Sequence, residues 1–211
     1  MERKKILEQT ADIDAELALL RGMLKTIEAT DFTAHPSVYE SLTVAAAMKA
    51  EKTACNLRHL IYAATNVTKR ELMKKVADVH GIDINYEDEI FTVMLPVLLQ
   101  KKKRGQSSEF ISDPLHFALE EFFEANSIEI FVECAVVFEH IYDGNRPGRR
   151  VCDYDNLELK PILDTVSAFV MTDDSGKFCD VFHTTGYADS DRTKISVMAK
   201  NKFWEWVSKR I

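Results

Sequence analysis

Residues 149–164 read RRVCDYDNLELKPILD, and they decide the expected fold because a strand pattern changes into a helix pattern within them. Asp153 and Asp155 are two residues apart, so in an extended segment their side chains project to the same face. From Leu159 to Val170, apolar residues recur at helical spacing, which predicts a helix that packs on a sheet. The stretch therefore predicts an α/β unit in which an acidic loop joins a strand to a covering helix.

The flanking sequence supplies further strands and helices for a mixed sheet. Ile82, Ile84 and Tyr86 alternate with polar residues, which is typical of a strand, and later apolar runs are rich in β-formers. In chain order we expect a strand or hairpin over 82–99, a helix over about 113–126, a strand over 128–142, a helix within 156–171, strands near 178–184 and 193–199, and a helix from about 201.

The N-terminal third predicts a helical hairpin. A seven-residue repeat of apolar side chains runs through Ile6, Ile13, Leu20 and Ile27, with Leu17 and Leu24 at the intervening positions. Pro36 ends this helix, and a second helix is expected to about residue 64, with Ser37 and Glu40 at the spacing of a capping box. We expect the repeat to be the packing face of the hairpin; an intermolecular coiled coil is the alternative.

A third helix, over about 68–79, ends at Gly81, because glycine commonly follows a helix C-terminus. We place the domain boundary there, so residues 1–80 form an α-helical arm and residues 81–211 an α/β domain. The expected fold class is α/β (α+β): a helical hairpin followed by a mixed sheet that is flanked by helices.

Composition excludes several classes of protein. The chain has 211 residues, 46% apolar and 29% charged, which is ordinary for a soluble globular protein. No apolar run approaches the roughly 18 residues of a membrane helix, and the first residues lack a secretion signal. The four Cys form no CxxC pair, so we expect reduced thiols and a cytoplasmic location. A net charge of −7 argues against coating nucleic acid through bulk positive charge.

The acidic residues suggest a metal site. Asp153 and Asp155 precede the predicted helix, and Asp173-Asp174 follow it and would fold back toward them. Converging carboxylates repel unless a divalent cation lies between them, and oxygen ligands favour Mg²⁺ or Mn²⁺. Such an ion would activate water for cutting a phosphodiester, with Lys160 stabilising the developing charge.

These acidic residues also fit ordinary structural roles. Asp155 and Glu158 have the spacing of a capping box, and Asp173-Asp174-Ser175-Gly176 has the composition of a turn.

The same residues resemble the signature of the RusA family of Holliday-junction resolvases. The chain has Asp153-Tyr154-Asp155-Asn156, then Lys160-Pro161, Leu163-Asp164 and Asp173-Asp174, and the likeness covers roughly residues 82–199. The resemblance implies a metal-dependent homodimer that cuts branched DNA. It implies Asp153, Asp155 and Asp174 as metal ligands and Lys160 as the catalytic lysine.

The chain departs from that signature at one point. Four residues separate Asp155 from Lys160, whereas the family usually has three, and one extra residue at the start of a regular helix rotates Lys160 by about 100° away from the expected position. The motif, the ending of its loop and the long helical arm resemble an uncharacterised relative of the resolvases that is carried on mobile genetic elements. A bulge would realign Lys160; without one the catalytic lysine is missing.

Two basic clusters are candidates for binding DNA phosphates. They comprise Lys101, Lys102, Lys103 and Arg104 in one loop, and Arg146, Arg149 and Arg150 next to Asp153. The alternative for the first cluster is a solvated loop. Phe203, Trp204 and Trp206 in the last helix would stack on bases, or more commonly form a core or dimer contact.

Two functions follow from the sequence. One is a Mg²⁺-dependent, structure-specific DNA endonuclease that works as a homodimer on branched or duplex DNA. The other is a catalytically impaired, RusA-like binding protein of a mobile element, such as an anti-CRISPR-like inhibitor of a host nuclease, whose acidic surface mimics DNA. In that case the N-terminal helices would contact a protein partner. No membrane role is expected.

Overall fold

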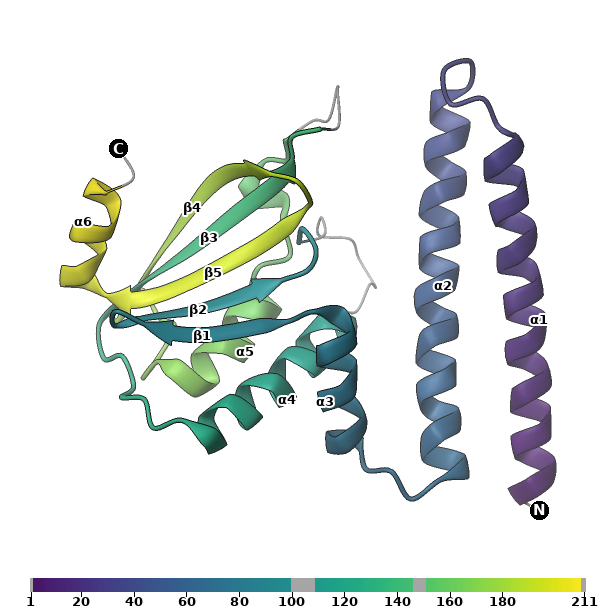
Figure 1. Cartoon of the computed structure of the whole chain (residues 1–211), viewed down its shortest axis with the longest axis horizontal. Helices are drawn as coiled ribbons and strands as arrows, with labels where there is room; N and C mark the ends of the chain where they lie inside the picture. Colours follow the sequence, from purple (N-terminus) through teal and green to yellow (C-terminus); the bar gives the residue numbers. More distant parts are fainter. Residues whose placement is uncertain (1, 100–108, 146–150, 210–211) are drawn as a thin grey trace. The chain divides into compact units, whose positions relative to one another are not determined.

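A computed structural model describes residues 2–99, 109–145 and 151–209, and the chain divides into two compact units, Met1–Lys69 and Arg70–Ile211. The fold is mixed α+β: a helical N-terminal region is followed by a five-stranded mixed sheet with helices (Figure 1). This agrees with the fold class expected from the sequence. No helix in the described residues has the length and hydropathy needed to span a membrane.

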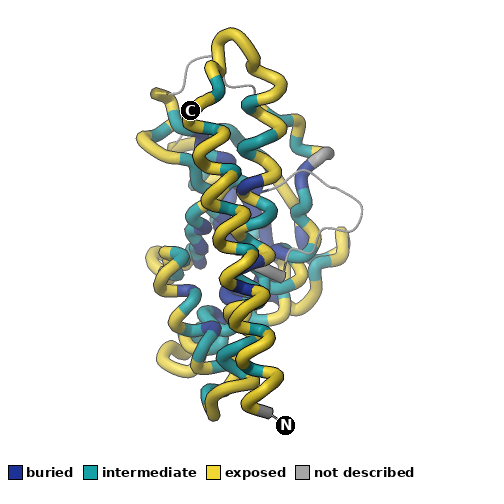
Figure 2. The backbone as a smooth tube through the Cα atoms, turned by 90° about the vertical axis from the view of Figure 1, so that its right-hand side faces the viewer, coloured by how far each residue is buried: buried dark blue, intermediate teal, exposed yellow. Residues whose placement is uncertain are grey.

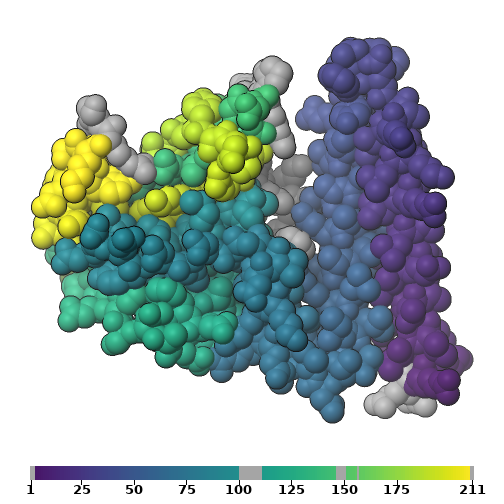
Figure 3. Space-filling model, in the orientation of Figure 1, coloured from purple at the N-terminus to yellow at the C-terminus, as the bar shows by residue number. Residues whose placement is uncertain are grey.

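The first unit is a hairpin of α1 (Glu2–Ala29) and α2 (Pro36–Ala64), whose side chains pack along both helices (Figure 3). Ile13 is buried and Ile6, Leu20 and Ile27 are half-buried, as expected for the packing face. Leu17 and Leu24, however, are 45% and 54% exposed. The prediction that Leu17 and Leu24 lie in the seam is therefore wrong. A second row of residues, each three positions after a residue of the repeat, turns toward α2 instead.

A polar network occupies part of that second row. The Glu16 carboxylate accepts hydrogen bonds from Lys49 Nζ at 2.9 Å, Asn56 Nδ2 at 2.9 Å and Thr53 Oγ1 at 3.3 Å. These bonds lower the pKa of Glu16, with the bond from Lys49 the largest cause. A carboxylate with three donors from the facing helix fixes the register of the two helices.

The predicted capping box at the start of α2 is absent. The helix begins at Pro36 with His35 as its N-cap residue and no side-chain capping hydrogen bond. Asp31 organises the preceding turn instead, accepting hydrogen bonds from Thr33 N at 2.8 Å and Ala34 N at 3.2 Å. Proline at the first helical position needs no N–H partner, so the helix starts there without a side-chain cap.

The domain boundary lies at 69/70 rather than near Gly81, because α3 (Lys69–His80) packs with the sheet unit. Met73 and Ala77 are buried, and Arg70 pairs with Glu120 at 3.0 Å on α4 (Glu109–Ala125). Gly81 does end α3, with a φ of 71°, as expected for glycine after a helix.

The sheet has the strand order β1-β2-β5-β3-β4. Its strands are β1 (Asp83–Glu87), β2 (Ile90–Leu95), β3 (Cys134–Asp143), β4 (Cys179–Ala188) and β5 (Arg192–Ala199). All neighbours are antiparallel except β3 and β4, which are parallel. The parallel pair requires a long crossover, and residues 144–178 supply it, including α5 (Lys160–Val170).

Two sequence boundaries in this unit are corrected. The strand expected from Ile128 begins at Cys134, because the Phe131 backbone bonds to the end of α5: its N–H donates to Val170 O at 2.9 Å. The helix expected to open at Pro114 begins at Glu109, with Pro114 inside it.

The core covers both faces of the sheet. Phe91, Val136 and Ile195 pack against α4 and α5 residues such as Leu115 and Ile162 on one face. On the other face, Ala135, Val137 and Met198 pack with Phe203 of α6 (Lys200–Ser208). Phe203 is buried and Trp204 is 71% exposed, so the C-terminal aromatic cluster is divided between core and surface.

Deletion of residues 1–65 should leave a sheet unit that folds cooperatively, whereas deletion of residues 1–80 should destabilise it by at least about 2 kcal/mol, because the second deletion removes buried Met73 and Ala77. Circular dichroism and urea unfolding would measure both. Failure of the shorter deletion to fold would show that the hairpin belongs to the folding unit of the sheet.

Candidate functional site

The acidic loop at the start of the crossover is anchored by one aromatic side chain. Tyr154 opens a 3-10 turn, η1 (Tyr154–Asn156), and its hydroxyl lies 2.6 Å from Thr185 Oγ1 on β4. The Tyr154 ring stacks on His140 of β3 and His183 of β4, with centroid distances of 5.2 and 5.0 Å. Three ring and hydroxyl contacts to two neighbouring strands therefore fix the residue between Asp153 and Asp155 on the sheet.

The two histidines under Tyr154 are neutral at pH 7. His140 is fully buried, and burial lowers its pKa to about 4, with the nearby His183 as a second cause. Burial also lowers the pKa of His183. His140 Nε2 lies 3.4 Å from His183 Nδ1, and His140 Nδ1 has no hydrogen-bond partner in the described parts of the chain. A proton on that nitrogen would be buried without an acceptor, so the neutral form is the one that fits.

Asp153 and Asp155 on either side of Tyr154 are exposed. Asp153 precedes η1 and makes no side-chain capping hydrogen bond. The helix α5 begins at Lys160 with Leu159 as its N-cap residue, also without a side-chain cap. The capping box of Asp155 and Glu158, which was the structural alternative for this motif, is therefore not formed.

Lys160 at the start of α5 meets two signature carboxylates. Its Nζ lies 2.9 Å from Asp164 Oδ1, one helical turn further on, and 4.0 Å from Asp174 Oδ2, which follows the helix. The hydrogen bond to Asp164 and, after it, the charge of Asp174 raise the pKa of Lys160. The chain thus folds back after α5 and brings Asp174 to the beginning of the helix, so Lys160 faces the acidic residues despite its shifted spacing.

The paired Asp173 and Asp174 have different roles. Asp173 accepts hydrogen bonds from Ser175 Oγ at 2.8 Å and Ser175 N at 3.2 Å, and these bonds lower its pKa, the hydroxyl first. This is the turn role expected as an alternative for the pair. Asp174 instead faces Lys160, and its assignment as a site residue stays a prediction.

The three carboxylates expected to share one ion are not gathered into a ligand set. Within residues 2–99, 109–145 and 151–209, no three His, Cys, Asp or Glu side chains are arranged to hold a metal ion. The expected convergence of Asp153, Asp155 and Asp174 is therefore corrected: Asp174 lies with Lys160, and the other two are exposed on the loop. The donors are still chemically suited to Mg²⁺, which commonly binds through one or two carboxylates together with water and substrate phosphates.

The residues expected to bind DNA phosphates lie outside the described parts of the chain. They are Lys101, Lys102, Lys103, Arg104, Arg146, Arg149 and Arg150. Their assignment stays a prediction.

Several residues of the site were not assigned a role from the sequence. Tyr154 and Thr185 connect the loop to the sheet, and Asp164 pairs with Lys160. The spacing of Lys160 and Asp164 by four residues was a readable signal for an ion pair on a helix. The contact between Tyr154 and Thr185 depends on the pairing of β3 with β4, which no local pattern specifies.

Comparisons with known proteins identify the family but no activity. The model of a family of unknown function, DUF6100, matches residues 2–211, so the chain belongs to that family. No curated protein matches the chain. Among solved structures, the periplasmic domain of Helicobacter pylori MotB is similar at 7% identity and a TM-score of 0.32, covering 62% of this chain and 90% of that one. A likeness at this level carries no functional argument.

The buried histidine predicts a pH-dependent stability. The pKa of His140 is about 4 in the folded state against an ordinary value of 6.5, so the unfolded chain binds the proton first as the pH falls. Stability from this group is complete above pH 6.5 and is lost between pH 6.5 and about 4, by about 3 kcal/mol. His140→Phe should flatten this part of the urea-unfolding profile, whereas His116→Gln, at an exposed position, should leave it unchanged. An equal slope in wild type and His140→Phe would contradict the assignment.

Proposed function

We propose that this chain is a metal-dependent endonuclease that acts on branched DNA, like the RusA-family resolvases that it resembles, with Asp153, Asp155, Asp174 and Lys160 as its catalytic residues. The observation that carries the proposal is the 4.0 Å approach of Lys160 Nζ to Asp174 Oδ2 across the full length of α5. Residues of one signature that are far apart in the sequence meet in space. The exposed Asp153 and Asp155 supply further oxygen donors in the same crossover.

Each residue of this set has a distinct part in the proposed reaction. Mg²⁺ or Mn²⁺, when bound, supplies an activated water and neutralises charge on the scissile phosphate. Asp153 and Asp155 are free of capping bonds and would hold that ion together with DNA phosphate oxygens. Lys160 would contact the phosphate, and Asp174, which the chain brings back to the start of the helix, would orient the Lys160 ammonium. Tyr154 keeps both loop carboxylates at the sheet.

The remaining parts of the proposal follow from the chemistry of the substrate. The basic clusters at 101–104 and 146–150 would contact the DNA backbone, since phosphate contacts fix position without reading sequence. Two opposed strands of a branched junction call for two copies of the site, hence a homodimer. We place this activity in the cytoplasm, where four cysteines without a disulfide are expected to stay reduced.

A second candidate is a binding protein with the same fold and little turnover. Two observations favour it: no three side chains form a metal site in the described residues, and Lys160 is already neutralised by Asp164 and Asp174. In this case the acidic surface, with a net charge of −7, would contact a protein such as a host nuclease of a CRISPR system, and the N-terminal helices would contribute to that contact.

Cleavage of a four-way DNA junction separates the two candidates. The endonuclease should cut it with Mg²⁺ or Mn²⁺ and not with EDTA, and Asp155→Asn or Asp174→Asn should lower the rate by at least about 100-fold. Asp173→Asn is the matched control, because the asparagine oxygen can still accept the hydrogen bond from Ser175 N, and its NH2 group can donate to Ser175 Oγ in place of the second bond. A wild-type chain that cuts no junction with either metal would reject the endonuclease and leave the binding protein.

The ion pair at the start of α5 gives a test that needs no turnover. Asp164→Asn removes the closest countercharge of Lys160 and should raise affinity for junction DNA by about threefold, with a steeper dependence on salt. Lys160→Met should lower the affinity and reduce the salt slope by about one. Fluorescence anisotropy over a series of salt concentrations would measure both. Unchanged binding in both variants would show that Lys160 does not contact DNA.

A further inference from the structure

The N-terminal hairpin buries very little of its own surface. Among its described residues, only Ile13, Ala46 and Thr53 are buried. Large apolar side chains on α1 remain exposed, among them Leu7 at 60% and Leu17 at 45%. In Figure 2, most of α1 accordingly carries the colour of exposed residues. Two helices give each other one contact face, whereas helices in a four-helix bundle have two neighbours, so the hairpin has the composition of half a bundle.

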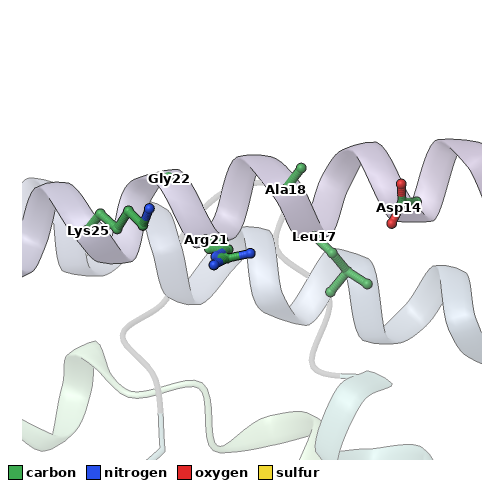
Figure 4. A pocket seen from close by; sticks show the side chains of 6 residues that line it. All are labelled: Asp14, Leu17, Ala18, Arg21, Gly22 and Lys25. Carbon is green, nitrogen blue, oxygen red and sulfur yellow. The ribbon is translucent and has the colours of Figure 1, made fainter.

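One face of α1 forms an open groove of about 540 Å³. Among the residues that the structure describes, it is lined by Asp14, Leu17, Ala18, Arg21, Gly22 and Lys25, which all belong to α1 (Figure 4). Each of these residues has another of them three or four positions away, so they share one side of the helix. At 3.6 residues per turn, Ala18 lies opposite Leu20 of the α2-facing row, and the groove residues are exposed.

The charges of this groove are arranged by sign. Asp14 lies at one end, and Arg21 and Lys25 lie at the other, about 16 Å of helix away for Lys25. In the part of the chain that the structure describes, none of the three has an ion-pair partner. Their charges are therefore available to a partner with the opposite arrangement.

We propose that this face of α1 binds the same face of a second copy in antiparallel orientation, so that two hairpins form a four-helix bundle. A two-fold axis near residues 19 and 20 sets Asp14 of each copy against Lys25 of the other, which pairs opposite charges twice. A parallel arrangement would instead set Asp14 against Asp14 and Lys25 against Lys25. The sign pattern thus selects both the occupant and its direction.

The uncharged groove residues fit the same pairing. Near the axis, Leu17 of one copy lies level with Gly22 of the other, and Ala18 lies level with the aliphatic part of Arg21. A Cβ atom added to Gly22 would meet nothing within 4 Å in its own chain, so packing within the hairpin does not require glycine there. Its missing side chain instead allows the second helix to approach closely.

Analytical ultracentrifugation of the full chain over a concentration series tests this dimer. We expect a reversible dimer in the wild type. Asp14→Lys or Lys25→Asp alone should raise its dissociation constant by about tenfold or more, because attraction becomes repulsion at two places. The double variant Asp14→Lys/Lys25→Asp should recover the wild-type dimer, since opposite charges meet again. Gly22→Leu should abolish the dimer by filling the gap.

Two controls keep the result interpretable. Asp12→Lys makes the same charge change as Asp14→Lys two residues away, on the other side of the helix, and should leave the dimer intact. Leucine favours helix over glycine by nearly 1 kcal/mol, so Gly22→Leu should keep the helix content seen by circular dichroism. A monomeric wild type, a dimer that survives every α1 variant, or a double variant that stays monomeric would each overturn the proposal, the last two in favour of a different surface or partner.

Discussion

The parallel pairing of β3 with β4 is the constraint on which the candidate site depends. Antiparallel neighbours can be joined by a turn, but parallel neighbours need a connection that returns along the sheet. Residues 144–178 make that return, and the acidic signature lies on it: Asp153 and Asp155 before α5, and Asp174 after it. The start and the end of such a crossover lie at opposite ends of the strand pair, yet the chain turns back after α5, and Lys160 Nζ comes within 4.0 Å of Asp174 Oδ2. The same pairing sets His140 opposite Thr185 and so creates the platform for Tyr154.

The loop combines a fixed backbone with free charges. The ring and the hydroxyl of Tyr154 both contact the sheet, so the hydroxyl oxygen has a hydrogen-bond partner where it is buried. Its neighbours Asp153 and Asp155 do not act as helix caps, and their side chains remain exposed. An anchored residue between two exposed carboxylates limits how far they can move. Lys160 differs from these two carboxylates, because its charge is already compensated by Asp164 and Asp174. A phosphate that binds Lys160 must therefore compete with both.

The sequence predicted the elements better than their contacts. Alternation and helical spacing located the strands, α5 and the stop at Gly81, because these patterns report which side of an element faces apolar neighbours. Local apolar content misplaced the start of β3: the segment before Cys134 reads as a strand, but the backbone of Phe131 bonds to Val170 and Thr172 instead. The seam of the hairpin was half predicted, because its polar half, which includes Glu16, cannot be recognised from hydrophobicity. For the site, the motif placed Asp153, Asp155, Lys160 and Asp174 around one predicted helix, but it predicted neither the ion pair of Lys160 with Asp174 nor the failure of the three carboxylates to form a metal site in the described residues.

The two units bury their apolar side chains to different extents. The sheet has helices against both faces, so Phe91, Val136 and Val137 lose contact with water within one chain. The hairpin has one seam, part of it occupied by the carboxylate of Glu16, and its other side carries leucines, small residues and unpaired charges. A polar seam fixes register at little gain in apolar burial, so further stability must come from the outer face of the helices. The proposed isologous pairing would supply it, and it would give every acidic loop a symmetric mate whatever the position of the sheet unit. Pairing through the arm would then provide the two sites that a branched substrate requires, without any contact between the sheets themselves.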